Sequence, residues 1–348
     1  MFGPVTTGSL DPILRGVSRS IFLTLRVAPR AVRKQLGVAY LFCRAADTIA
    51  DTRLLSRDSR LDHLQRFRAQ FEAEAPRKEE LERIASEVGA PQAIPEEKAL
   101  LLRLEECFAA HGGFDDHDRA LVRKLVTTLT RGMEMDLLSF PPEESGEIKA
   151  LEKEEDLDLY TYYVAGCVGE FWTELQVAHI PALSSWRVPR MRELGVRFGK
   201  GLQLTNILRD VDRDLSMGRC YFPRPRLEAA CVSPEELKAG RGRERLKPVL
   251  DEYLELALDH YRAGWEYTLA IPRRVPRMRL ACAWPLLIGL PTLALLARAP
   301  DPYAPGTFHR IPQKTVWWIL WQSTLRVFSN RAMDRLYRRM EREVSGNW

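Results

Sequence analysis

The stretch Gln203-Leu-Thr-Asn-Ile-Leu-Arg-Asp-Val-Asp-Arg-Asp214 carries the pattern that decides the fold. Its apolar residues recur three and four positions apart, which predicts an amphipathic helix. Asp210 and Asp214 are four positions apart, so their carboxylates project from one face of that helix. Like charges at this spacing cost roughly a few tenths of a kcal/mol in an isolated helix, and more where water is excluded. Such a pair is therefore expected in open solvent or where a cation binds.

The rest of the 348-residue chain has the same helical character. Apolar residues recur at helical spacing between turn-rich breaks, and no alternating strand pattern is flanked by hairpin turns. No break is long or simple enough in composition to be an interdomain linker. We therefore predict one all-α domain over residues 1–348 that ends in an amphipathic helix over 315–345.

A second aspartate pair lies far upstream, in Ala46-Asp-Thr-Ile-Ala-Asp51. On both predicted helices the acids continue a polar stripe, and apolar residues occupy the other faces. The stripes are Arg33, Gly37, Tyr40, Arg44, Asp47 and Asp51, and Gly199, Gln203, Asn206, Asp210 and Asp214. A solvated face would explain either stripe alone, but such faces are usually rich in Lys and Glu. Glycine would also let another group approach the helix backbone. Together the stripes favour a functional cavity.

Four acids on two helices suit a divalent-metal site that holds a polyanion. Mg²⁺, or Mn²⁺ in its place, prefers oxygen ligands and combines one or two carboxylates with phosphate oxygens and water. The expected metal ligands are Asp47, Asp51, Asn206, Asp210 and Asp214. Arginine binds phosphate oxygens through paired hydrogen bonds, and the candidates are Arg44, Arg209 and Arg219. Gln203 can add a hydrogen bond. Asp212 lies about 200° around the helix from Asp210, so we expect it to be a solvated acid.

Composition argues against other classes of function. The net charge of +5, from 52 Lys and Arg against 47 Asp and Glu, is too small and too interleaved for nucleic-acid binding. It suits a phosphorylated substrate or an anionic membrane. The six cysteines and six histidines show no metal-ligand spacing, so we expect buried reduced thiols and a cytoplasmic protein. The N-terminus lacks a signal-peptide pattern. The apolar run over 281–297 is broken by proline and glycine, which predicts a buried core helix.

Six motifs follow one another along the chain. They are Ser18-Arg-Ser20, the stripe from Tyr40 to Asp51, Arg131-Gly-Met-Glu-Met-Asp136, Tyr160-Thr-Tyr-Tyr-Val-Ala-Gly-Cys-Val-Gly169, the stretch 203–214, and Gly218-Arg-Cys-Tyr-Phe-Pro223. In that order they resemble the squalene/phytoene synthase family, the head-to-head prenyl transferases. The resemblance implies the all-α isoprenoid synthase fold, with helices around a central apolar cavity and a catalytic core over about residues 15–298.

The resemblance also implies roles for individual residues. The four aspartates would bind Mg²⁺ and prenyl diphosphates. The diphosphate region would be lined by Ser18, Ser20, Tyr40, Arg44, Gln203, Asn206, Arg209, Arg219 and Tyr221. Tyr160 would handle a proton or steady a cation. The apolar channel would include Phe22, Val164, Ala165, Gly166 and Leu202. Loss of diphosphate from an allylic carbon leaves a carbocation, so the metal ions held by the acids, together with the arginines, must neutralise the leaving group while the cavity excludes water.

Members of this family end the reaction in different ways. Asp47-Thr-Ile-Ala-Asp51, Ala281-Cys-Ala-Trp-Pro-Leu286 and Lys314-Thr-Val316 favour squalene synthase, which joins two farnesyl diphosphates through presqualene diphosphate and uses NADPH. The alternatives are phytoene or dehydrosqualene synthase, which lose a proton, and presqualene diphosphate synthase, which stops at the cyclopropyl diphosphate. NADPH would bind without a dinucleotide-binding fold, because no Gly-x-Gly-x-x-Gly follows a strand.

Other classes of protein fit the residues less well. A head-to-tail prenyl transferase would carry Asp-Asp-x-x-Asp motifs, and a terpene cyclase would carry a different metal triad. The remaining class is a non-catalytic scaffold in a membrane-associated isoprenoid complex. Intact acids in both aspartate pairs argue against a scaffold. The sequence does not indicate an oligomeric state.

The chain ends in an aromatic row followed by a basic row. These rows are Trp317, Trp321, Leu325 and Phe328, then Arg331, Arg335, Arg338, Arg339 and Arg342. The favoured interpretation is a final helix whose aromatic face docks on the core. The alternative is an amphipathic helix in peripheral contact with the inner face of an anionic membrane, where an apolar product could be delivered.

Overall fold

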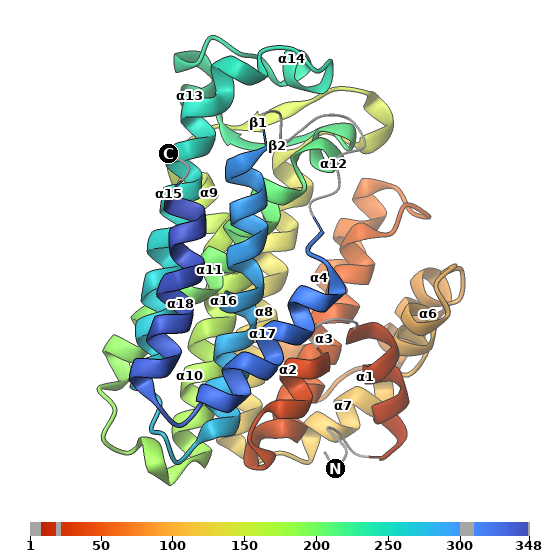
Figure 1. The fold of residues 1–348 in the computed structure, drawn as a ribbon. Coiled ribbons are helices and arrows are strands. Elements are labelled where there is room, and N and C mark those ends of the chain that lie inside the picture. The colour runs from red at the N-terminus through yellow and green to blue at the C-terminus, as the bar shows by residue number, and fades with distance from the viewer. Residues whose placement is uncertain (1–7, 19–21, 300–309, 347–348) are drawn as a thin grey trace. The chain divides into compact units, whose positions relative to one another are not determined.

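The computed structural model describes residues 8–18, 22–299 and 310–346, and almost all of them are helical (Figure 1). The one sheet among these residues pairs β1 (Lys149–Leu151) with β2 (Arg219–Pro223) in parallel, with an irregularity between Ala150 and Leu151. The predicted all-α class is therefore confirmed. By its internal contacts the chain groups into two compact units. The N-terminal unit comprises residues 1–137 and 171–186, and the C-terminal unit comprises 138–170 and 187–348. A single domain stays a prediction.

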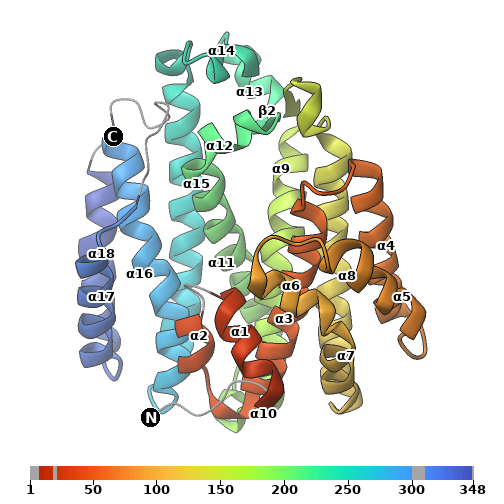
Figure 2. The same ribbon diagram turned by 90° about the vertical axis from the view of Figure 1, so that its right-hand side faces the viewer.

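The N-terminal unit is built around the aromatic face of one helix. Its α-helices are α1 (Asp11–Ser18), α2 (Phe22–Val27), α3 (Arg33–Asp51), α4 (Arg57–Glu72), α5 (Lys78–Ile84), α6 (Pro95–Leu102), α7 (Leu104–Gly112), most of α8 (Asp116–Ser139) and the end of α10 (Cys167–His179). Phe42 of α3 contacts the rings of Phe71 on α4 and Phe108 on α7, at centroid distances of 4.8 and 4.7 Å. Figure 2 shows α1, α3 and α6 side by side. The buried face of α3 thereby leaves its polar stripe outside this core.

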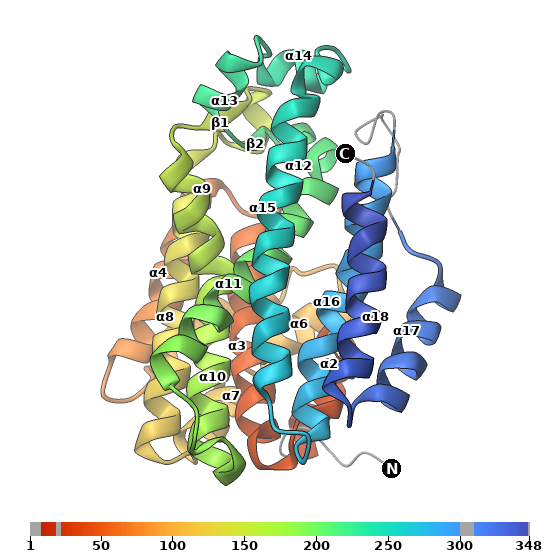
Figure 3. The ribbon, with the colours of Figure 1, turned by 60° about the vertical axis from the view of Figure 1, so that its left-hand side comes forward.

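The C-terminal unit is organised by two long neighbouring helices, α11 (Val188–Arg209) and α15 (Arg243–Ala270), as Figure 3 shows. Its other α-helices are α9 (Glu154–Thr161), the start of α10, α12 (Val211–Ser216), α13 (Arg224–Ala229), α14 (Pro234–Lys238), α16 (Pro276–Arg298), α17 (Gln313–Arg326) and α18 (Asn330–Ser345). A π-helical turn, η6 (Tyr162–Gly166), connects α9 to α10. Trp265 of α15 stacks on Tyr337 of α18 at 4.5 Å between ring centroids. Both rings are buried in one apolar core.

The apolar run over 281–297 lies in α16. Among the described residues, α16 is the one helix long and apolar enough to cross a membrane, and 61% of its most apolar 18-residue window is buried. Leu286, Leu290 and Leu293 are fully buried and belong to the core of the C-terminal unit. This packing agrees with the predicted core helix.

The prediction of one C-terminal helix over 315–345 is wrong. The segment folds as two helices, because the chain turns between Arg326 and Asn330 and Ser329 caps α18 by accepting a hydrogen bond from the backbone N–H of Ala332 at 3.3 Å. The expected docking of the aromatic row on the core is also wrong. The four members of that row, Trp317, Trp321, Leu325 and Phe328, are exposed.

Candidate functional site

The candidate residues of the N-terminal unit lie on the polar face of α3. Tyr40, Arg44 and Asp47 are half-buried and Asp51 is exposed, whereas the intervening apolar residues are buried. The predicted stripe therefore forms a polar surface from Tyr40 to Asp51, whereas Arg33 and Gly37 are buried. Arg44 Nη1 lies 3.7 Å from Asp47 Oδ2. Arg33, at the start of the stripe, instead has a buried structural role and donates to the Ala28 carbonyl at 2.8 Å.

Arg44 has a second acidic partner that sequence reasoning missed. Its Nη2 donates to the carboxylate of Glu97, a buried side chain on α6. Glu97 lies 53 positions from Arg44, so no local spacing could reveal the pair. The contact holds the guanidinium in a charge-assisted hydrogen bond. With Asp47 and Asp51, this face carries three acids and one arginine, which is a charge pattern that favours a cation.

The electrostatics of Asp47 support the same conclusion. The pKa of this carboxyl is raised to about 7, first because surrounding protein displaces water and then because Asp51 is close, while Arg44 opposes the shift. Since 42% of the Asp47 side chain is exposed, water screens part of this effect. A carboxylate repelled by its neighbour gains stability from a bound cation.

The remaining predicted residues of the N-terminal unit lie near the end of α1. Ser18 is buried, and its hydroxyl donates to the Leu14 carbonyl of its own helix. The Tyr40 hydroxyl donates to the Val17 carbonyl at 3.3 Å, which connects α3 to α1. Phe22 is half-buried, with the guanidinium groups of Arg15 and Arg26 over its ring. Ser20 lies outside the described residues.

The candidate residues of the C-terminal unit lie where α11 meets α12. A continuous helix was expected here, but α11 ends at Arg209 and Asp210 takes a bent conformation (φ −104°, ψ 14°) before α12 begins. Aspartate has low helix propensity because its side chain competes for backbone hydrogen bonds. The Asp210 N–H still bonds the Asn206 carbonyl, and the Asp214 N–H bonds the Asp210 carbonyl, each at 2.9 Å. The four-residue relation between the acids is therefore preserved.

Arg209 forms a two-point ion pair with Asp210 in this structure. Its Nε and Nη2 donate to the two carboxylate oxygens at 2.8 and 2.6 Å. This hydrogen bonding is the main reason that the pKa of Arg209 is raised. On the same helix, Asn206 is exposed and its amide donates to Gln203 Oε1 at 3.4 Å. Asp212 is exposed, as predicted for a solvated acid.

Asp214, Arg219 and Tyr221 meet at a small hollow in the C-terminal unit. Apolar side chains from α11, α12 and β2 complete its lining. Arg219 Nη2 donates to Glu143 Oε1 at 3.0 Å, and both side chains are mostly buried. Glu143 lies 76 positions away and was also missed by sequence reasoning.

Tyr160 and Tyr221 form a stacked pair. Their ring centroids are 4.9 Å apart with planes inclined by 23°, and their hydroxyl oxygens are 3.2 Å apart. Tyr160 is half-buried at the end of α9, and Tyr221 is buried on β2. The sequence assigned these tyrosines to different motifs, and the fold makes them one aromatic site.

Glycines on the polar stripes were expected to let another group approach the helix backbone. On α11 that group is protein backbone. A Cβ added at Gly199 would lie 2.2 Å from the Ala165 carbonyl oxygen, and one at Gly169 would lie 1.9 Å from the Gly195 oxygen. The backbone that approaches α11 is therefore the segment from η6 into α10, and not a ligand. Gly166 is buried in the same contact. The predicted channel residues Val164, Ala165 and Leu202 are half-buried on these packed elements.

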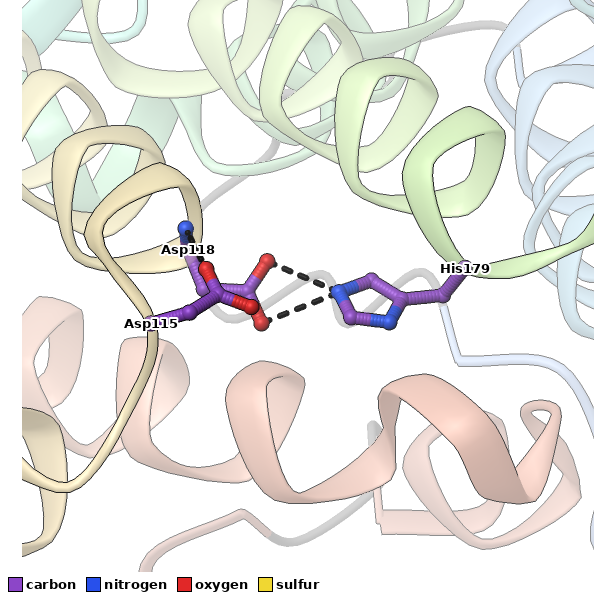
Figure 4. Close-up of side chains that lie close together, drawn as sticks. All are labelled: Asp115, Asp118 and His179. Atoms are coloured by element: carbon purple, nitrogen blue, oxygen red, sulfur yellow. Dashed lines mark hydrogen bonds and ion pairs between the residues drawn. The ribbon is translucent and has the colours of Figure 1, made fainter.

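Asp115, Asp118 and His179 form the one cluster of three potential metal ligands among the described residues (Figure 4). Each group already has a protein partner. Asp115 Oδ1 accepts from the Asp118 N–H at 2.8 Å at the start of α8. The Asp118 carboxylate contacts His179 Nε2 at 2.8 and 2.9 Å and accepts from Gln35 at 2.7 Å. We interpret the cluster as a cross-link between α3, α8 and α10.

The four predicted aspartate ligands fit a hard divalent cation better than the cluster around Asp118 does. Asp47 is partly exposed and is destabilised by its like-charged neighbour, and Asp210 and Asp214 stay one turn apart. Carboxylate and amide oxygens are the ligands that Mg²⁺ takes in proteins. For NADPH, the described residues contain no strand followed by a glycine-rich turn and a helix, so no dinucleotide-binding fold is formed.

Comparison with known proteins gives consistent matches. The family model described as squalene/phytoene synthase matches residues 14–318. The presqualene diphosphate synthase of Rhodopseudomonas palustris is 30% identical over 256 residues, covering 74% of this chain and 76% of that protein. The bifunctional lycopene cyclase/phytoene synthase of Blakeslea trispora is 31% identical over 233 residues, which cover 66% of this chain. The match spans about a third (34%) of the length of that bifunctional protein.

Two solved structures show the same fold. A ligand complex of TcSQS superposes with a TM-score of 0.73 at 22% identity, over 97% of this chain and 98% of that one. The squalene synthase HpnC from Alicyclobacillus acidocaldarius superposes with a TM-score of 0.54 at 20% identity, over 82% of this chain and 93% of that one. The predicted isoprenoid synthase fold is therefore confirmed.

Proposed function

The chain belongs to the squalene/phytoene synthase family, and we propose that it condenses two prenyl diphosphates head to head with the assistance of Mg²⁺ or Mn²⁺. The observation that carries the proposal is the pair of acidic faces, each with an arginine held among its acids. A prenyl diphosphate offers the polyanion that such faces would bind through metal ions.

The acids and arginines have distinct tasks in this proposal. Asp47, Asp51, Asp210 and Asp214, with Asn206, would hold the metal ions. Bound Mg²⁺ would neutralise the charge that develops on the departing diphosphate. Arg44 and Arg219, each oriented by a buried or mostly buried glutamate, would donate to phosphate oxygens. Gln203 and Tyr40 would donate further hydrogen bonds to the diphosphates.

The tyrosine pair suits the carbocation stage. Ionisation of an allylic diphosphate leaves a cation that attacks the double bond of the second prenyl chain, and loss of a proton then closes a cyclopropane. The ring faces of Tyr160 and Tyr221 can stabilise positive charge without reacting with it. Their adjacent hydroxyls would relay the proton released in this step to the departed diphosphate, which is the base that accepts it.

We propose two farnesyl diphosphates as the substrates and presqualene diphosphate as the first product. The first aspartate motif favours onward conversion to squalene with NADPH. The presqualene diphosphate synthases of Rhodopseudomonas palustris and Sinorhizobium fredii, 30% and 29% identical to this chain, favour a reaction that stops at the cyclopropyl diphosphate. Phytoene or dehydrosqualene formation, which needs no hydride, is the third outcome of the test.

The deciding experiment supplies purified protein with Mg²⁺ and either farnesyl or geranylgeranyl diphosphate, with and without NADPH, and identifies products by mass spectrometry. Squalene formed only with NADPH supports the hydride step. Presqualene diphosphate under both conditions supports the shorter reaction. If geranylgeranyl diphosphate gives a product and farnesyl diphosphate does not, the proposed substrate is wrong. No turnover of any prenyl diphosphate would favour a scaffold. A cytoplasmic location with peripheral contact to the inner face of the membrane completes the proposal.

A further inference from the structure

Helix α17 has two apolar faces, and only one of them is covered. Ile319, Leu320 and Ser323 are buried, and Ser323 accepts a hydrogen bond at 3.1 Å from the indole of Trp284 on α16. The other face carries Trp317, Trp321 and Leu325, which are 59%, 59% and 61% exposed. Lys314 and the partly exposed Trp318 fall on the same arc, about 100° wide. Contiguous exposed apolar surface of this kind marks an interaction site.

Helix α18, beside α17 in Figure 3, has a buried apolar face and an exposed basic face. The basic face consists of Arg331, Arg335, Arg338, Arg339 and Arg342, which also share an arc of about 100°. Arg338 pairs with Asp334 and Glu341. The other four form no ion pair within the described part of the chain, so their charge is available to a partner.

The net positive charge of the chain comes from residues 310–348. Residues 310–348 contain eight Lys and Arg against three Asp and Glu, an excess of five. The complete chain contains 52 against 47, also an excess of five, so residues 1–309 are balanced at 44 of each sign. The exposed tryptophans and the net positive charge therefore lie in the same 39 residues.

We propose that α17 and α18 form a docking surface for an anionic lipid bilayer. Tryptophan is enriched where an apolar ring meets the headgroup region, and each basic side chain near an anionic membrane strengthens binding roughly fivefold. The α17 aromatic residues would enter the interface, and the α18 arginines would contact lipid phosphates. A second copy of the chain is a poorer occupant, because it would bring an equal positive charge to the contact. This inference rests on the peripheral membrane contact included in the proposed function and assigns it to a surface, and its test without substrate does not depend on the catalytic function.

The test is cosedimentation of the purified full-length protein with vesicles, without substrate. The vesicles are phosphatidylcholine alone or phosphatidylcholine containing phosphatidylglycerol. The wild-type protein should bind the anionic vesicles more tightly, and added salt should weaken this binding. The triple variant Arg331→Gln/Arg335→Gln/Arg339→Gln should lose affinity for anionic vesicles on the order of a hundredfold. The double variant Trp317→Ser/Trp321→Ser should lose binding to both kinds of vesicle.

Matched controls separate this surface from general charge and hydrophobicity. Arg187→Gln/Lys238→Gln/Arg241→Gln removes the same charge from exposed positions elsewhere in the C-terminal unit, and Leu256→Ser removes an exposed apolar residue of α15. Both controls should bind as the wild type does. Circular dichroism melts verify that each variant is folded.

Equal binding by all folded variants overturns the proposal. So does lipid-free dimerisation, seen by sedimentation velocity, that disappears in the tryptophan variant, because a second copy would then cover this face.

Discussion

Arg44 is the residue whose surroundings decide how the acidic face of α3 can bind a ligand. It contacts Asp47 on its own helix and Glu97 on α6, so its guanidinium is already aimed before any substrate arrives. Arg219 is held in the same way by Glu143 in the other unit. A pre-oriented donor loses little entropy when it binds a phosphate oxygen. These glutamates are positioning residues in the proposed mechanism.

Glu97→Gln tests this role. Glutamine keeps the shape and an acceptor oxygen but replaces a charge-assisted hydrogen bond with a weaker neutral one. We expect kcat/KM with farnesyl diphosphate to fall about tenfold, mainly through KM, together with weaker binding of inorganic diphosphate and Mg²⁺ measured by calorimetry. The exposed neighbour Glu96 supplies the control, and Glu96→Gln should leave both values unchanged. Unchanged diphosphate binding in Glu97→Gln would show that Glu97 is only structural.

His260 on α15 makes the stability of the protein depend on pH. Its pKa is lowered from the ordinary value of 6.5 to about 4, first by burial and then by the charge of Arg197. As the pH falls from about 6.5 toward 4, the unfolded chain binds a proton that the folded chain does not. The free energy of unfolding should therefore fall by roughly 1–3 kcal/mol over this range.

Denaturant titrations at several pH values measure this effect. His260→Gln should flatten the dependence. His63 and His111, whose pKa values are also lowered by burial, still contribute in the same direction, whereas Asp47, whose pKa is raised to about 7, contributes in the opposite direction. His117→Gln changes an exposed histidine and should leave the slope as it is. If His260→Gln retained the full slope, the pH dependence would arise elsewhere.

At the scale of elements, the contact between α11 and the segment from η6 into α10 positions several candidate residues of the C-terminal unit. Glycines allow this approach, because Gly199 and Gly169 face backbone carbonyl groups. The same helix then carries Gln203, Asn206 and Arg209 toward the bend at Asp210. Sequence periodicity predicted the helical character of α3 and α11, because their buried faces repeat at helical spacing, but it did not predict that α11 ends at Arg209. It could not predict the packing partner of Gly199, since that contact joins separate elements.

Gly199→Ala should destabilise the fold strongly. The added Cβ would lie 2.2 Å from a carbonyl oxygen of the backbone, so one of the two elements must move. We expect a loss of about 2 kcal/mol or more in the free energy of unfolding, measured by urea titration. Gly112→Ala is the matched control, because a Cβ at this position of α7 would meet no atom within 4 Å. That change should be neutral or slightly stabilising. Equal stability of both variants would contradict the close contact.

At the scale of the whole molecule, the acids of the proposed metal site are divided between the two compact units, with Asp47 and Asp51 in one and Asp210 and Asp214 in the other. The sequence revealed each pair by its four-residue spacing and predicted the fold class by helical periodicity. It missed Glu97 and Glu143, because partners 53 and 76 positions away leave no local pattern. It also missed the exposure of the α17 aromatic row, because periodicity shows that a face is apolar but not whether anything covers it.

If one diphosphate-binding function uses both acidic faces, substitutions in different units should not act independently. We expect Asp51→Asn and Asp214→Asn each to lower kcat/KM by about a thousandfold or more, since each removes a ligand needed to neutralise the leaving group. The double variant should be much less impaired than the product of the two effects, because residues that act as a unit are not additive. Asp212→Asn, an exposed acid between two proposed ligands, should retain activity.

Thermal melts provide a second measure, because Mg²⁺ with inorganic diphosphate should raise the Tm of the wild type and of Asp212→Asn only. A Tm increase that survives in Asp214→Asn but not in Asp51→Asn would confine the metal site to the N-terminal unit, and the reverse would confine it to the C-terminal unit.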